Sequence, residues 1–101
     1  RWMVGYVRPL RDYYDAVVQG RDRTSILDLL VKYTSLKDRS VLERVVLHTY
    51  NPDGYVNVEA LQEDLNVFLQ LGVVQQPVDL RTVVDHQFVD YAIQRLGRYA
   101  P

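Results

Sequence analysis

The strongest turn signal in the chain is Asn51-Pro52-Asp53-Gly54, which continues as Tyr55-Val56-Asn57. Proline at the second position of a turn presets the backbone there, and Asn and Asp side chains bond back to neighbouring amides. Glycine then closes the turn. Asn57 is a favourable N-cap for a helix that follows. The stretch therefore predicts a tight turn that separates one group of helices from another.

Apolar residues recur at helical spacing on both sides of this turn. The spacing predicts five amphipathic helices, over residues 2–19, 24–34, 40–47, 58–71 and 80–96. No segment requires a β-strand, and no shift in composition marks a second domain. We therefore expect an all-α chain in which residues 1–101 form a single helical unit.

The first helix has an apolar stripe that contains Val7, and it also contains a proline. The ring of Pro9 presses on the carbonyl of Gly5, so we expect a bend between these residues. Glycines follow several apolar runs: Gly20 lies where a left-handed helix end is expected, and two later helices are expected to end at Gly72 and Gly97.

The later helices have candidate N-caps and candidate buried faces. Ser25 with Asp28 fits a capping box, with Asp22 as a rival cap, and Ser40 with Glu43 fits a second box. Asp79 is expected to cap a short turn and Asp85 to cap the last helix. The residues expected to face inward in these helices include Leu29, Tyr33, Val41, Val45, Val46 and Phe88.

Composition excludes several classes of function. The net charge of −1, with cations and carboxylates interspersed, gives no electrostatic basis for binding nucleic acid or an anionic membrane. The absence of cysteine excludes disulfides, thiolate zinc sites and cysteine nucleophiles. No apolar run has the roughly 18 residues of a membrane-spanning helix. The chain opens at Arg1 inside a periodic apolar segment, which favours a fragment or a processed chain.

No motif for catalysis or metal binding emerges. If the central turn were a calcium loop, Thr49 and Ala60 would occupy its first and twelfth positions, where strong oxygen ligands are needed, so a plain turn is favoured. His48 and His86 belong to no metal motif. We expect His86 to serve in a surface capping turn and His48 to bond carbonyls at a helix end.

Carboxylates and aromatic residues are the remaining candidates for function. The pairs Asp12 with Asp15 and Glu63 with Asp64 are expected on solvated faces, since general acids need shielding. The first helix is crowded with aromatic residues, namely Trp2, Tyr6, Tyr13 and Tyr14. Such crowding is typical of a ligand pocket, a partner interface or packing against a larger protein. On the last interpretation Trp2 and Tyr6 would be partly exposed, or paired with another copy, in the isolated chain.

The chain also resembles a known family along essentially its whole length. The resemblance rests on the turn at residues 51–57, Leu61-Gln62, Leu71-Gly72-Val73-Val74, Pro77-Val78-Asp79 and residues 84–92, with Tyr6-Val7-Arg8 and Arg11-Asp12-Tyr13 upstream. In order and spacing these motifs are similar to the C-terminal part of nitrate/sulfonate/taurine-type ABC transporter substrate-binding proteins. That family shares its fold with the thiamine-pyrimidine synthase proteins.

The resemblance implies a role in transport. Full members are longer, have two α/β lobes that close on a small solute, and deliver it to a membrane permease outside the cytoplasm, in the periplasm of many bacteria. This chain would be the helical C-terminal portion that packs on one lobe. No position matches a ligand motif of the family, and the cysteine-rich motif and active-site histidine of the pyrimidine synthase branch are not identifiable. The resemblance therefore implies no enzyme activity, no cofactor and no assignable solute-binding residue.

Two hypotheses follow from the sequence. The first is a segment of an extracytoplasmic solute-binding protein that serves an ABC importer of nitrate, a sulfonate, taurine or a pyrimidine. The alternative is a self-standing helical module whose aromatic first helix docks a partner protein. Because apolar faces would be left open in the isolated chain, we also expect it to associate with a second copy, for example by exchange of the first helix.

Overall fold

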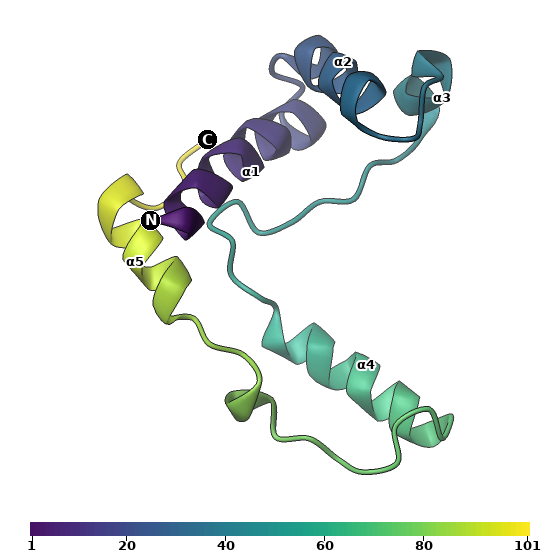
Figure 1. Cartoon of the computed structure of the whole chain (residues 1–101), viewed down its shortest axis with the longest axis vertical. Helices are drawn as coiled ribbons and strands as arrows, with labels where there is room; N and C mark the ends of the chain where they lie inside the picture. The colour runs from purple at the N-terminus through teal and green to yellow at the C-terminus, as the bar shows by residue number, and fades with distance from the viewer.

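The computed structural model describes all 101 residues and is all-helical (Figure 1). Its elements are α1 (Trp2–Val18), α2 (Arg23–Tyr33), α3 (Arg39–Arg44), α4 (Val58–Gln70), the 3-10 helix η1 (Leu80–Thr82) and α5 (Gln87–Leu96). The fold class predicted from the spacing of apolar residues is confirmed. None of the helices combines the length and apolarity that a membrane crossing requires.

Two of the predicted helices differ from the structure by more than one residue at a limit. The helix expected over residues 40–47 ends at Arg44, because Val45 already has extended backbone angles. The region 80–96 is not one helix but η1 and α5, separated by four residues. α1 runs through Pro9 without interruption; the bend expected near Gly5 stays a prediction.

Side-chain caps fix where most helices begin. Asn57 accepts a hydrogen bond from the Ala60 amide, and Asp79 accepts one from the Arg81 amide, as predicted. The Asp85 carboxylate accepts the Gln87 amide at the start of α5. The capping box at Ser40 is wrong, because Asp38 takes that role and accepts both the amide and the hydroxyl of Ser40.

The second helix also begins differently from the capping box at Ser25. Asp22 is the residue that precedes α2, and its carboxylate accepts a hydrogen bond from the Ser25 hydroxyl. Gly20, Gly72 and Gly97 all have positive φ at the predicted helix ends, but Gly97 has a ψ of 171° and so lies outside the left-handed helical region. At Gly72 the amide of Val73 returns to the Phe68 carbonyl at 2.9 Å, as in a Schellman motif.

The core lies where α1 crosses α5 and meets the central turn. Val7, Val89 and Ala92 are buried in these elements, and Ala16 is buried further along α1. A β-carbon on Gly54 would lie 3.3 Å from Val7 Cγ2 and 3.6 Å from Val89 Cγ2, so the turn packs directly against both helices. The turn thus closes the junction between the two halves of the chain.

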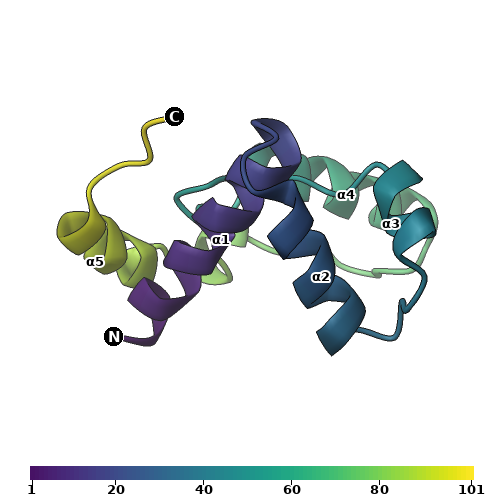
Figure 2. The same cartoon turned by 90° about the horizontal axis from the view of Figure 1, so that it is seen from above.

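Two arms leave this junction and diverge. One arm is formed by α2 and α3, which contact each other and join α1, while the other is formed by α4 and η1 (Figure 1). Viewed from above, α2 crosses close to α1, whereas α4 lies apart from α5 (Figure 2). The radius of gyration is 16.7 Å, whereas a compact chain of this length has about 13 Å. The molecule is therefore open.

Several faces expected to be buried are open in this arrangement. Leu29, Tyr33 and Phe88 are exposed, and so are the apolar residues at the end of α3. Val46 is almost fully exposed, while Leu42 and Leu27 supply the buried contacts of that arm. The helical spacing was predicted correctly, but no element of the chain covers these faces.

Candidate interaction surface

A buried ion pair holds the junction together. Nη2 of Arg11 on α1 lies 2.7 Å from Oδ1 of Asp53, which is only 8% exposed. The same Asp53 oxygen accepts the Tyr99 amide at 2.8 Å, and Arg11 also donates to the Gly97 carbonyl at 2.6 Å. The helix α1, the central turn and the segment after α5 thus meet at one carboxylate.

The central turn has the geometry of a turn and not of a metal loop. The Gly54 amide donates to the Asn51 carbonyl at 2.8 Å, and the Asp53 amide donates to the Asn51 side chain at 2.9 Å. The Asp53 carboxylate is occupied by Arg11 and Tyr99. No group of three or more His, Asp or Glu side chains comes together as metal ligands.

Tyrosine hydroxyls tie the ends of the elements together. The Tyr55 hydroxyl donates to Asp90 at 2.6 Å, and that hydrogen bond is the main reason why the pKa of Tyr55 lies above its usual value. The Tyr99 hydroxyl donates to Asp15, which raises the pKa of Tyr99 in the same way. Tyr13 donates to the His48 carbonyl at 2.8 Å. These aromatic residues are structural ties.

The two histidines lie in different surroundings. His48 is exposed, and its backbone carbonyl is the acceptor for Tyr13. His86 is half-buried with its ring edge-on to Tyr55 at 5.2 Å, and its Nε2 atom is buried without a hydrogen-bond partner. The capping-turn position expected for His86 is found, since His86 directly precedes α5, but its ring is half-buried against Tyr55 and not on the open surface. The expected bonding of His48 to helix-end carbonyls is also not found.

Three of the four paired carboxylates are exposed, and the fourth is hydrogen-bonded within the chain. Asp12, Glu63 and Asp64 are exposed, as expected. Asp15 is not simply solvated, because Tyr99 covers it and bonds to it. This contact and the Arg11–Asp53 pair could not be predicted from local patterns, since their partners lie 84 and 42 residues apart.

An open groove runs beside the junction. It has a volume of about 640 Å³ and is lined by tyrosine rings, small polar groups and apolar side chains. The lining residues are Tyr6, Leu10, Thr49, Tyr50, Asn51, Gly54, Tyr55, Val56 and Asn57. Tyrosine and asparagine together supply apolar area and hydrogen bonds, a combination typical of surfaces that meet another protein segment.

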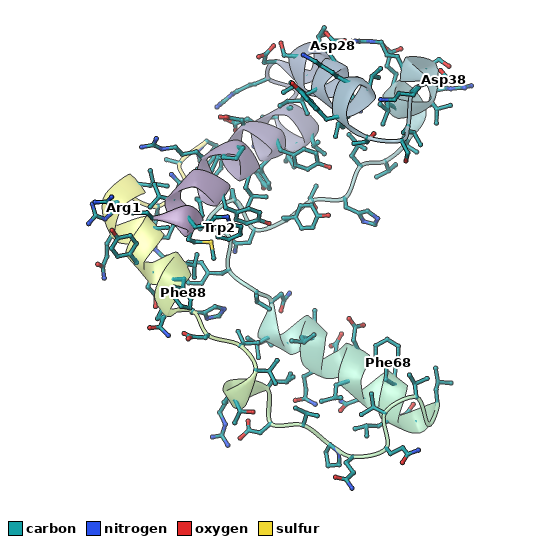
Figure 3. The ribbon with its side chains drawn as sticks, viewed as in Figure 1. Arg1, Trp2, Asp28, Asp38, Phe68 and Phe88 are labelled. Carbon is teal, nitrogen blue, oxygen red and sulfur yellow. The ribbon has the colours of Figure 1, made fainter.

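The aromatic surface continues past this groove to the start of α1. Trp2 and Tyr6 are stacked, with ring centroids 5.5 Å apart, and Trp2 is 77% exposed. A hollow of about 430 Å³ separates Trp2 from Phe88 and Tyr91 on α5. Trp2 and Phe88 lie where the two helices begin, on neighbouring parts of the molecule (Figure 3). We call the region around Trp2, Tyr6 and Phe88 the aromatic face.

The whole chain exposes more surface than a compact protein does. Its accessible area is 7722 Å², whereas a compact protein of 11.8 kDa exposes about 5,900 Å². Each chain thus leaves about 1,800 Å² uncovered relative to a compact fold. A standard protein–protein interface covers about 800 Å² on each partner. The uncovered surface is large enough for one extensive interface or two standard ones.

Comparison with known proteins gave no match to any family model, to any curated protein or to any solved structure.

Proposed function

We propose that the chain is the helical C-terminal portion of an extracytoplasmic solute-binding protein that delivers a small solute to an ABC importer. In this role the helices bind no solute themselves. They pack on an α/β lobe and keep it folded, while the solute is held between that lobe and a second one. The resemblance of the motifs between Tyr6 and Ala92 to that family is the source of the proposal.

The observation that carries it is the uncovered apolar surface. Trp2 and Phe88 are the most exposed side chains of the aromatic face, and no other part of the chain covers either of them. A stacked Trp–Tyr pair exposed to water is typical of a protein–protein interface and not of a surface that stays in contact with solvent. The uncovered area of about 1,800 Å² corresponds to the extensive, permanent class of interface. A lobe of the same protein is a partner of that kind.

The junction explains how such a portion keeps its shape. The Arg11–Asp53 pair fixes α1 against the central turn, and the Tyr55–Asp90 bond fixes the turn against α5. With these contacts in place, Trp2 and Phe88 line one hollow between the starts of α1 and α5, and Tyr6 stacks on Trp2. The two helices that carry the aromatic face are thus positioned before a partner covers it, which lowers the entropic cost of packing.

The test is to produce the complete protein encoded by the reading frame that contains this chain. Upstream codons are expected to encode alternating strands and helices headed by an export signal. The fluorescence difference between that protein and its Trp2→Phe variant should show a buried, blue-shifted Trp2, while the 101-residue chain shows an exposed one. A thermal-shift panel of nitrate, taurine, alkanesulfonates and pyrimidines would identify the solute. A Trp2 that remains fully exposed in the complete protein would overturn the proposal.

The exposed Trp2–Tyr6 stack also favours a second candidate, a self-standing helical module that docks another protein through α1. The same experiment separates the two. A reading frame without α/β lobes, together with loss of partner binding on Trp2→Ala, would support the module.

A further inference from the structure

Beyond the proposed function, we infer that the two arms of this chain are complementary docking surfaces, through which two copies pair by packing α4 of each against α2 of the other. The occupant of each arm is thus the opposite arm of a second copy. This surface is distinct from the aromatic face.

The arm that contains α4 is acidic and has an apolar stripe. Residues 57–85 carry one cation, Arg81, and five carboxylates, namely Glu59, Glu63, Asp64, Asp79 and Asp85. On α4, Glu63, Val67 and Leu71 follow one another at steps of four, so they lie along one line of the helix surface. Val67 is 50% and Leu71 69% exposed, and Glu63 takes part in no ion pair of the chain.

The arm that contains α2 has the opposite charge and a matching stripe. Residues 21–44 carry four carboxylates against six cations, namely Arg21, Arg23, Lys32, Lys37, Arg39 and Arg44. Leu29 and Tyr33 are 49% and 72% exposed and lie one turn apart. Lys32 lies over the Tyr33 ring at 5.0 Å, and Lys37 bonds only to backbone carbonyls at the end of α2. Neither lysine has a carboxylate partner in the chain.

The two stripes match when α4 and α2 run antiparallel. Leu71 then faces Leu29 of the second copy, Val67 faces Tyr33, and Glu63 lies near Lys32 and Lys37. The apolar pairs have the same four-residue spacing on both helices, about 6 Å along the axis. The acidic end of the α4 stripe, at Glu63, thus meets the basic end of the α2 stripe, at Lys32 and Lys37. This charge pairing fixes the register and the direction of packing.

The open shape supplies the room for this pairing. The two arms diverge, and α1 and α5 already contact each other at the junction, so no exchange of α1 is needed (Figure 1). A two-fold axis makes the α4–α2 contact twice, which doubles the buried area and closes the assembly. A standard interface of about 800 Å² per partner uses less than half of the uncovered surface, and the aromatic face stays free for a lobe.

The first test reverses the charges at the predicted contact, with sedimentation equilibrium as the readout. Lys32→Glu and Glu63→Lys are each expected to raise the dimer dissociation constant about tenfold or more, and the double variant should restore it. Gln94→Glu, on the exposed face of α5, is the control. Like Lys32→Glu it makes the net charge more negative, but it should leave the dimer intact. A monomer at micromolar concentration, or an open-ended polymer, would overturn the inference.

The second test places cysteines, because the native chain has none. Leu29→Cys chains mixed with Leu71→Cys chains are expected to form mixed disulfides under mild oxidation, while each variant alone stays mostly uncrosslinked. Gln94→Cys mixed with Leu71→Cys is the control for random collision. Equal crosslinking in the control and test mixtures, or preferential pairing of Leu29→Cys with itself, would show that the arms do not pack as inferred.

Discussion

At the scale of single residues, Asp53 joins segments that are far apart in the sequence. It receives hydrogen bonds from Arg11 and from the Tyr99 amide, and both partners are held in a largely dehydrated environment. Removing one member of a buried ion pair leaves the other charge without compensation. The stability of the junction therefore depends on this carboxylate more than on any exposed ion pair.

Asp53→Asn is expected to lower the free energy of unfolding by about 3 kcal/mol, because the half-buried Arg11 would lose its counter-charge. Asp79→Asn is the matched control, since Asp79 pairs with Arg81 at the surface and its loss should change stability little. Urea unfolding followed by circular dichroism measures both. Equal effects of the two substitutions would contradict the role of Asp53.

The tyrosine ties predict how stability depends on alkaline pH. The folded-state pKa values of Tyr55 and Tyr99 are raised above the unfolded value of about 10 by their hydrogen bonds to carboxylates. Their contribution is therefore complete below about pH 10 and is lost as pH rises through the raised values. In a titration followed by tyrosine absorbance, Tyr55→Phe should remove a late-ionising group. An unchanged late phase in Tyr55→Phe would contradict the Asp90 tie.

At the scale of elements, two glycines of the chain should respond in opposite ways to substitution by alanine. Gly54 has φ of +82° and lies against Val7 and Val89, so Gly54→Ala should destabilise the protein by about 1–2 kcal/mol. Gly5 lies inside α1 with open space around it, so Gly5→Ala should stabilise it by about 0.5–1 kcal/mol. Thermal unfolding of both variants measures the contrast. A stabilising Gly54→Ala would mean that the turn does not pack on the core.

Local signals explain why most elements could be predicted from the sequence. The Asn57 cap and the glycine ends act within a few residues, so the limits of α4 are close to those expected. The errors arise where two local solutions compete. At α3, both Asp38 and Ser40 are residue types that can cap a helix. In the structure Asp38 is the cap, and Ser40, two residues later, donates to the Asp38 carboxylate.

Helix faces could be predicted less well than helix positions, because a face is buried only if another element reaches it. Leu29 and Tyr33 have the spacing of a buried stripe, yet they are open since the arm of α4 diverges. Long-range pairs such as Arg11–Asp53 could not be predicted either, because the spacing of residues does not indicate which turn packs against which helix. The candidate surface was anticipated only in part, through the aromatic residues of α1.

At the scale of the whole molecule, openness is the property on which the proposals depend. A compact arrangement of the same helices would cover the arms and the aromatic face, leaving no area for a lobe or a second copy. The chain instead spreads over 44 × 35 × 22 Å. Its stability is therefore expected to increase with concentration or with a partner, because any partner that binds only the folded state shifts the folding equilibrium.

The most direct test of this account is small-angle X-ray scattering from the monomer peak of the 101-residue chain, isolated by size exclusion or through the Lys32→Glu variant. The account predicts a radius of gyration close to the 16.7 Å of the structure. A value near the roughly 13 Å of a compact chain would contradict it, because the arms would then close on each other and bury the surfaces from which both proposals were drawn.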